Sequence, residues 1–276
     1  MSVEPQETDF LVKFEIDNFP AEYRRYYSMK RNNLFARIQE FNVLWKLYIQ
    51  LDEIWMREFS DLQSLREPYS MLPILCCMNA HAKMRVSLEL AFSDCLAEAR
   101  SILRGAIEFF AHAHAMYADT SLQKTWLDKV NGKQELEAFK DAFERNKRQG
   151  LFKGLDELHK TWGQLSETGS HANAIAMSER FAQIESDDHV EFRLNYTGTG
   201  TQMWVTSVFT LLLTCFTMED TFFKDYNDRL KFDIELICKR TAFQNAKEQL
   251  RASIANTFQL SPPGGIHRPR PTIYTP

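Results

Sequence analysis

Proline and glycine are scarce in the interior of this 276-residue chain, and no other feature limits its fold as much. Only two of the nine prolines, Pro68 and Pro73, lie between residues 21 and 260, and the whole chain contains ten glycines. Both residue types disfavour helix interiors, whereas Leu, Ala, Glu and Lys favour them. The sequence therefore predicts an all-α fold, an up-and-down bundle of about six to eight helices.

Apolar residues recur at steps of three and four along most of the chain, as they do in amphipathic helices. The residue before proline resists helical geometry, so a first long helix should run from near Ala21 or Asn33 to Arg66, and Glu67-Pro68 should end it. A second helix should start near Tyr69, and Ser93-Asp94 either caps a separate helix or continues this one. Further helices are expected at 121–130, 133–148, 155–167, 202–226 and 228–258.

The two ends of the chain differ from its middle. Residues 1–20 are expected to form an N-terminal arm with an alternating, strand-like pattern at Phe10, Val12, Phe14 and Ile16. Residues 190–196 alternate in the same way, which predicts two short β-strands that pair with each other or across a dimer. Residues 259–276 are rich in Pro and Gly and are expected to be a flexible tail, leaving 21–258 as a single helical-bundle domain.

Composition places few limits on function. The net charge of −4 provides no overall attraction to nucleic acid, so an RNA partner is not supported by net charge. The five cysteines lack CxxC spacing, which predicts buried free thiols in a reducing compartment. The longest apolar stretch, Met203 to Met218, contains four threonines and is expected to be a buried core helix. With an acidic, polar N-terminus, we expect a cytoplasmic protein with no membrane partner.

The stretch from Met84 to Asp119 has the period of a long amphipathic helix. The arc opposite its apolar face combines small residues with Arg100, Arg104, Glu108 and His112, and no lysine occurs between Lys83 and Lys124. A solvated helix face normally carries Lys, Glu and Gln. This arc therefore indicates close packing or a lined cleft.

The candidate site residues are Arg104, Glu108, His112 and, further along the chain, His171. One interpretation is a series of i,i+4 ion pairs on a partly exposed helix, each stabilising it by roughly 0.2–0.5 kcal/mol. The other is a polar seam facing a cleft, in which Arg104 and Glu108 orient each other and His112 transfers protons. GxSxG, HExxH, Glu-x-x-His and nucleotide-binding glycine motifs are all missing, so no cofactor and no metal are expected.

Two segments resemble a known group. ARSILRGAIEFFAHAHAMYAD and LSETGSHANAIAM are similar to uncharacterised bacterial all-helical proteins allied to the HEPN superfamily, over roughly residues 70–225. The resemblance implies a helical bundle in which Arg104 and Glu108 lie near Ser166 and His171. HEPN ribonucleases place four to six residues between an Arg and a His, whereas seven residues separate Arg104 from His112 here.

Two functions are therefore expected from the sequence, and a small-ligand-binding bundle with a closed pocket lined by Arg104, Glu108 and His171 is a third possibility. The first is a non-enzymatic intracellular protein that acts as a homodimer or with a protein partner, in bacterial defence or stress regulation. The second is a HEPN-like, metal-independent ribonuclease or RNA-modifying toxin. In that case Arg104 would stabilise phosphate charge, Glu108 would orient it, and His112 or His171 would act as general acid or base.

Overall fold

The computed structural model describes residues 20–62, 68–167, 181–185, 190–194, 200–227 and 234–258. Apart from one pair of short strands, the elements in these residues are helices, so the fold class is all-α, as expected. The long helices are α1 (Ala21–Glu40), α2 (Asn42–Asp61), α3 (Pro68–Phe92), α4 (Leu96–Ala118), α9 (Thr201–Tyr226) and α10 (Ile234–Phe258). Shorter helices are α5 (Ser121–Asp128), α6 (Lys133–Phe139) with its π-helical continuation η2 (Lys140–Glu144), and α7 (Asp156–Leu165). The arm before Pro20 and the tail after Phe258 lie outside the described residues.

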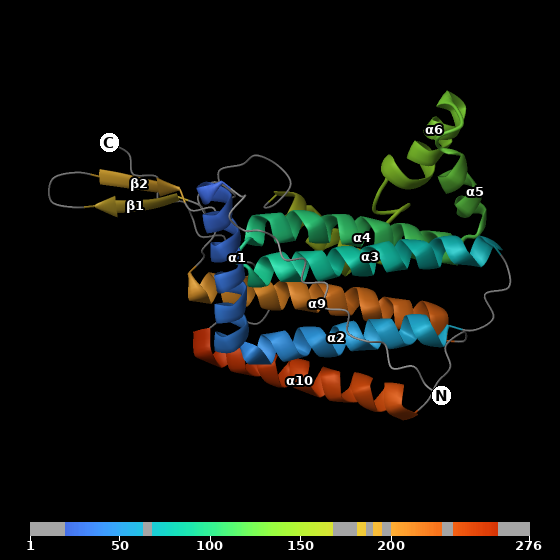
Figure 1. Cartoon of the computed structure of the whole chain (residues 1–276). Helices are drawn as coiled ribbons and strands as arrows, with labels where there is room; N and C mark the ends of the chain where they lie inside the picture. The colour runs from blue at the N-terminus through green and yellow to red at the C-terminus, as the bar shows by residue number, and fades with distance from the viewer. Residues whose placement is uncertain are drawn as a thin grey trace, which may run out of the picture.

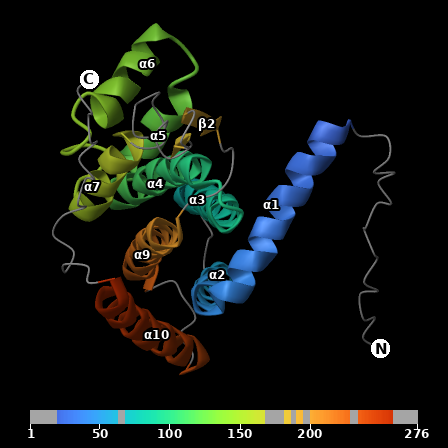
Figure 2. The same ribbon diagram turned by 90° about the vertical axis from the view of Figure 1, so that its left-hand side faces the viewer.

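Six helices, α2, α3, α4, α7, α9 and α10, pack side by side and alternate in direction along the chain (Figure 1, Figure 2). Trp45 meets Phe92 and Trp55 meets His81, so α2 and α3 are antiparallel. Helix α9 runs parallel to α2 and to α4. In the sequence α7 comes between α4 and α9, and it runs back along α4 in the opposite direction.

The core is built from large aromatic residues of α2, α3, α4 and α9. Trp55, Phe92, Phe110, Trp204 and Phe222 are each at most 1% exposed. The Trp204 indole N–H donates to the carbonyl of Ala91 over 2.8 Å, so its polar atom has a partner in the core. These contacts fix the position of α4, the helix that carries most of the candidate residues.

The first long helix is not continuous to Arg66 as predicted. It breaks at Phe41, whose backbone leaves the helical region (φ −119°, ψ 48°), and α2 ends at Asp61. The Phe41 ring packs against Trp204 at 4.9 Å, and the neighbouring Arg37 pairs with Asp94 over 3.2 Å. These tertiary contacts turn α1 out of the bundle, so that it projects from one face (Figure 2).

The helix predicted over Met84–Asp119 is also interrupted, at residues 93–95. Asp94 adopts a left-handed conformation with φ +62°, and the Cys95 N–H donates to the Leu90 carbonyl over 2.8 Å. This is the pattern of a Schellman helix end, and Asp is one of the few residues that tolerates the left-handed region. Ser93 and Asp94 therefore end α3 and do not cap α4, and α3 and α4 form an antiparallel hairpin.

The predicted strand at 190–196 is present as β2 (Val190–Leu194), but its partner is β1 (Phe181–Glu185). The two strands are antiparallel, with Phe181 opposite Leu194 and Glu185 opposite Val190. The segment that the sequence suggested as partner, residues 10–16, lies outside the described residues. The prediction located one strand correctly and missed its neighbour.

Two further expectations concern α9 and the cysteines. Among the described residues, α9 is the one helix long and apolar enough to cross a membrane, and 56% of its apolar window is buried inside the protein. Cys76, Cys77, Cys95 and Cys215 are buried free thiols, as predicted. Cys238 is free but exposed on α10, so the prediction of a buried thiol is wrong there.

Candidate functional site

The four polar residues at four-residue intervals on α4 do not share one environment. Each step of four residues rotates the side chain by about 40°, so Arg100 and His112 point about 120° apart. The Arg100 guanidinium donates to Ser207 of α9 over 3.2 Å. Arg104 faces the end of α7, Glu108 faces Lys147 in the turn after η2, and His112 faces α6 and η2. The predicted seam is therefore divided among several neighbouring segments.

Arg104 has the largest set of contacts among them. Its Nε donates to the Ser166 hydroxyl over 2.7 Å, and that hydroxyl donates to the Trp162 carbonyl over 2.8 Å. Its terminal nitrogens lie 3.4 and 3.5 Å from the Glu108 carboxylate oxygens, and its guanidinium carbon lies 4.6 Å from the centre of the Trp162 ring. Arg104 and Ser166 are thus together, the neighbourhood that the family resemblance implies.

Lys147 completes this cluster, and the sequence analysis did not include it. Its ammonium nitrogen lies 3.5 Å from Glu108 Oε1 and 4.5 Å from the centre of the Trp162 ring. The side chains of Arg104, Glu108 and Lys147 are 25%, 29% and 29% exposed. We call Arg104, Glu108, Lys147, Trp162 and Ser166 the α4–α7 cluster. Its two cations and one carboxylate leave one net positive charge at a half-buried position.

His112 belongs to an aromatic environment apart from that cluster. Its ring stacks on Phe139 at 5.8 Å and meets Phe143 edge-on at 4.9 Å, and its Nδ1 is buried without a partner in the described part of the chain. Burial, together with the positive charges of Lys129 and Lys147, lowers the pKa of His112 from 6.5 to about 4. The imidazole is therefore neutral at physiological pH, which does not suit a general acid.

His171, the fourth candidate, lies outside the described residues, so its distance from Arg104 is not defined.

His114, a second histidine on α4, has a carboxylate partner. Its Nδ1 lies 2.6 Å from the Asp225 carboxylate of α9, and both side chains are mostly buried. Gly154 lies beside His114 Nε2 and has a left-handed φ of +81°, a conformation that suits glycine.

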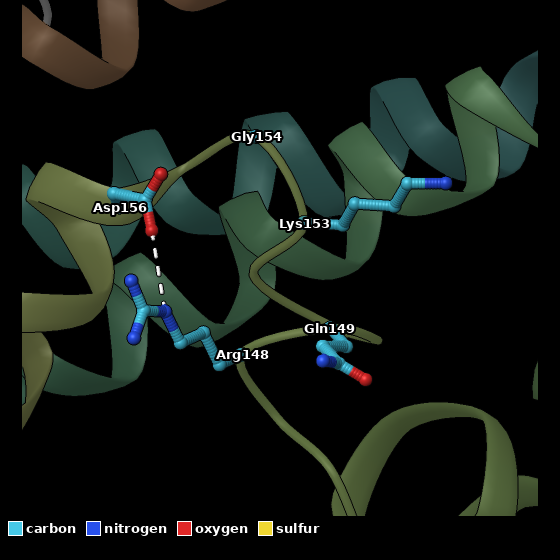
Figure 3. Close-up of a pocket in the computed structure, with 5 residues that line it drawn as sticks. All are labelled: Arg148, Gln149, Lys153, Gly154 and Asp156. Carbon is cyan, nitrogen blue, oxygen red and sulfur yellow. Dashed lines mark ion pairs between the residues drawn. The ribbon is translucent and has the colours of Figure 1, made fainter.

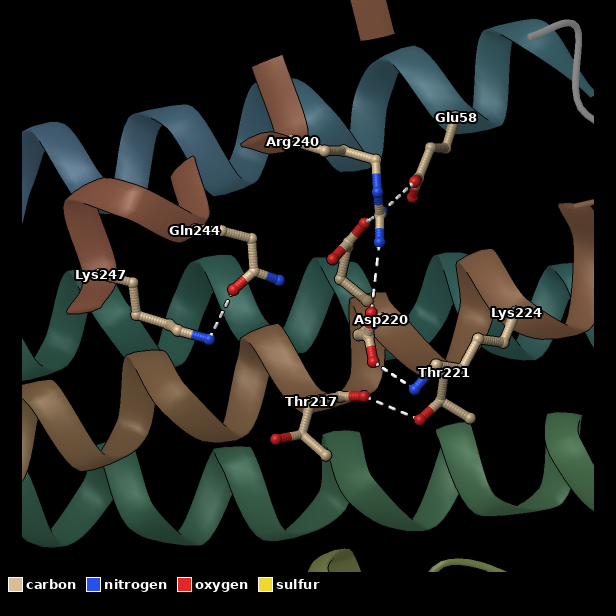
Figure 4. A network of polar contacts seen from close by, with 9 residues as sticks. Glu58, Thr217, Asp220, Thr221, Lys224, Arg240, Gln244 and Lys247 are labelled. Atoms are coloured by element: carbon tan, nitrogen blue, oxygen red, sulfur yellow. Dashed lines mark hydrogen bonds and ion pairs between the residues drawn. The ribbon is translucent and has the colours of Figure 1, made fainter. Parts of the chain in front are cut away.

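A second group of charges is more deeply buried than the α4–α7 cluster. Arg240 of α10 pairs with Glu58 of α2 over 2.8 Å, with Asp220 of α9 over 3.3 Å, and with Glu219 (Figure 4). The side chains of Glu58 and Glu219 are 0% exposed. Burial, with a smaller contribution from the nearby Asp220, raises the pKa of Glu58 to about 8 despite the opposing attraction of Arg240.

The sequence does contain a signal for this buried group. Glu58 continues the apolar stripe of α2 after Leu51, Ile54 and Trp55, at the same helical spacing. Glu219 likewise lies on α9 among buried residues such as Cys215, Met218 and Phe222. A carboxylate within an apolar stripe requires a cationic partner, and the sequence does not identify which of the 33 lysines and arginines supplies it.

A hollow with a volume of about 520 Å³ lies beside the turn that follows η2 (Figure 3). It is lined by Arg148, Gln149, Lys153, Gly154 and Asp156. Arg148 and Asp156 are 3.5 Å apart across it, and both side chains are 74% exposed. The hollow is a polar surface feature adjacent to Lys147 and is separate from the aromatic environment of His112.

The described residues thus offer one half-buried cationic cluster and one deeply buried acid–base cluster. Within these residues no group of three or more His, Cys, Asp or Glu side chains is placed to hold a metal ion. The α4–α7 cluster carries charge that suits an anionic group, and the buried cluster holds α10 against α2 and α9. Comparison of the chain with protein-family models, with curated proteins and with solved structures finds no match.

Proposed function

We propose that this protein is a non-enzymatic intracellular helical protein that acts by self-association. Binding to a different protein partner is the alternative form of this proposal. The observation that carries the proposal is the surface of α1. Five large apolar or aromatic side chains are 38–60% exposed on this one helix: Tyr23, Tyr26, Tyr27, Met29 and Phe35. A role in bacterial defence or stress regulation belongs to the same proposal.

The physical argument concerns how an isolated helix behaves in water. Most helical stability in proteins comes from packing of one face, and a single helix of about 15 residues is marginal by itself. From Ala21 to Met29 every residue of α1 is exposed, so this half of the helix has little packing to stabilise it. Clustered exposed aromatic residues are typical of protein–protein contact sites. Burial of Tyr23 and Tyr27 against a partner would supply the missing packing.

The contacts of the candidate residues agree with a role other than catalysis. The pKa of His112 is about 4, and its ring is enclosed by Phe139 and Phe143. Arg104 is held by Ser166, Glu108 and Trp162. These groups join α4 to its neighbours, and this structural role accounts for their contacts.

The test is the mass of the full chain in solution, by sedimentation velocity over a range of concentrations. We expect a dimer that dissociates on dilution, and we expect Tyr23→Glu/Tyr27→Glu to be monomeric. Leu127→Glu/Val130→Glu is the matched control, because it also places two carboxylates at exposed apolar positions, near the end of α5. A wild-type chain that is monomeric at every concentration, and that retains no protein partner, would remove the proposal.

A second candidate is the HEPN-like activity, and one observation favours it. The 2.7 Å bond from Arg104 Nε to Ser166 Oγ joins the two segments that carry the family resemblance, and Lys147 adds a second cation beside them. An RNA phosphate would suit that net positive charge.

The matching experiment measures RNA degradation, or growth arrest on expression, for Arg104→Ala, Arg104→Lys and His171→Ala. Arg145→Ala is the control, because Arg145 is an exposed cation outside the α4–α7 cluster. Activity that is lost in the first three variants and kept in the control would establish the ribonuclease. Activity that survives in all of them would reject this candidate.

A further inference from the structure

An apolar stripe runs along the outer face of α3 without a partner in the described part of the chain. Its side chains follow helical spacing and are 38–47% exposed: Met71, Leu75, Met78 and Val86. Residues 71–82 contain no Asp, Glu, Lys or Arg, and their polar side chains are Asn79, which donates to the Leu75 carbonyl over 3.0 Å, and His81, which pairs with Asp52. A helix with so few polar side chains is normally covered over most of its surface. One face of α3 is covered by the core, and the other is open.

Helix α2 widens the same face. The Asp52 carboxylate bridges α2 and α3 by bonds of 2.6 and 2.7 Å from Arg85. One turn to either side of Asp52, Ile49 and Met56 are 37% and 47% exposed. We call the α3 stripe together with Ile49 and Met56 the α2–α3 face. It is rich in methionine, a side chain that adapts to varied partner surfaces.

Helix α1 leaves its own bundle next to this face but does not cover it. Lys30 approaches Glu89 to 3.8 Å and Arg37 pairs with Asp94 over 3.2 Å, so the attachment is at the end of α3 beyond Val86. From there α1 extends away, on the side of the molecule where α2 and α3 lie (Figure 2). A helix of 20 residues is about 30 Å long, enough to cover a stripe of about 22 Å.

Charge identifies the kind of surface that α1 fits. It carries five basic residues (Arg24, Arg25, Lys30, Arg31, Arg37) and two acidic ones (Glu22, Glu40), a net charge of +3. The whole chain has −4, so the remainder has −4 − 3 = −7. A basic, tyrosine-rich helix on an otherwise acidic chain is attracted to a second copy of that chain.

We propose that in the dimer α1 of each copy lies on the α2–α3 face of the other. The contact is reciprocal and self-complementary, as a two-fold symmetric interface requires. Tyr23 and Tyr27 pack against Leu75 and Met78 of the second copy, which covers both apolar surfaces at once. The inference rests on the proposed function, because it names the partner and the surface for the self-association argued above.

The test uses two variants that damage opposite halves of the same contact. Tyr23→Glu/Tyr27→Glu disrupts the apolar surface of α1, which we call the donor helix. Leu75→Glu/Met78→Glu disrupts the α2–α3 face that receives it, which we call the acceptor face. We expect each variant alone to be monomeric, with a dissociation constant at least about tenfold above wild type. Mixed in equal amounts, they should form a heterodimer, because the intact α1 of one fits the intact face of the other. Leu127→Glu/Val130→Glu should dimerise as wild type does.

Each other outcome has a defined meaning. If the acceptor variant still dimerises, or the mixture stays monomeric, reciprocal exchange is wrong although self-association stands. If wild type is monomeric, self-association itself fails. Wild type that is monomeric yet co-sediments with phosphatidylcholine–phosphatidylglycerol vesicles would identify an anionic lipid surface as the occupant of α1 and overturn the exchange. Circular dichroism checks folding, and Leu75→Gln/Met78→Gln replaces the acceptor variant if the carboxylates unfold it.

Discussion

At the scale of single residues, His112 shows how position changes the chemistry of a candidate. The sequence places it four residues after Glu108, where it resembles a proton-transfer group. In the fold it lies against Phe139 and Phe143, and its pKa falls to about 4. Three aromatic rings enclose it, those of Trp126 in α5, Phe139 in α6 and Phe143 in η2. These residues lie 14 to 31 positions further along the chain.

This environment predicts how stability depends on pH. Because the folded pKa of His112 is below the unfolded value of 6.5, the unfolded chain binds a proton that the folded chain does not between pH 6.5 and 4. The free energy of unfolding should therefore fall by about 3 kcal/mol as the pH drops through this window. His112→Leu should remove that fall, as measured by urea unfolding at pH 7 and pH 4.5. An unchanged slope would mean that the imidazole is solvated.

The raised pKa of Glu58 predicts the opposite dependence of the free energy of unfolding on pH. Its pKa is raised from 4.5 to about 8, so the folded chain holds a proton that the unfolded chain has released between those values. This group therefore makes the free energy of unfolding fall as the pH rises from 4.5 to 8. In Glu58→Gln the fall should be reduced, and the variant should exceed wild type in stability at pH 9. A variant that is less stable than wild type at pH 9 would contradict a protonated Glu58.

At the scale of elements, α10 depends on Arg240 for its position. This one guanidinium meets Glu58 of α2 and both Glu219 and Asp220 of α9, and it lies 3.6 Å from the centre of the Phe223 ring. Removing one partner of a buried ion pair leaves uncompensated charge, at a cost of about 3–5 kcal/mol. The buried ion pairs of α10 therefore converge on a single side chain, beside the apolar contacts of Leu236, Phe243 and Ile254.

Arg240→Ala should accordingly loosen α10 before the rest of the protein unfolds. We expect faster amide exchange along Ile234–Phe258 and a lower melting temperature. The neighbouring Lys239→Ala is the matched control, because Lys239 is 41% exposed and pairs only at 3.4–4.0 Å with Glu235 and Glu53. Equal effects of the two substitutions would show that the buried cluster does not hold the helix.

The turn between α3 and α4 is the second element-scale feature, and Asp94 has two roles there. Its left-handed backbone closes α3, and its carboxylate pairs with Arg37 at the root of α1. Asp94→Asn retains a residue that tolerates this backbone but loses the charge, whereas Asp94→Ala loses both. We expect Asp94→Ala to lower the free energy of unfolding by about 1–3 kcal/mol more than Asp94→Asn does. Equal losses would mean that the charge alone matters.

At the scale of the whole molecule, the proposed self-association depends in part on the separation of charge between α1 and the rest of the chain. Helix α1 has a net charge of +3 and the remainder −7. Salt screens attraction between exposed charges beyond about 8 Å at physiological ionic strength. The dimer dissociation constant should therefore rise when the salt concentration is raised from 50 to 500 mM, by sedimentation velocity. A dissociation constant that falls as the salt concentration rises would indicate an apolar contact to which electrostatic attraction does not contribute.

Much of the fold followed from periodicity. The helix predicted at 202–226 is α9 (Thr201–Tyr226), and the short helices α5 and α7 lie within the predicted ranges 121–130 and 155–167. Of the candidate site, the meeting of Arg104 with Glu108 follows from their i,i+4 spacing. Lys147 was missed because a basic pair in a turn is normally solvated, and nothing near it in sequence indicates that Glu108 and Trp162 lie beside it.

The sequence by itself therefore determined the helical class, the apolar faces of the helices and the charge of α1, because these depend on residues three or four positions apart. The tertiary structure alone decided where helices break and which charges meet. Arg37 and Asp94 are 57 positions apart, and Arg240 and Glu58 are 182 apart. Contacts over such separations depend on how whole helices pack, and that packing turned α1 outward and left the α2–α3 face uncovered by the other residues that the structure describes.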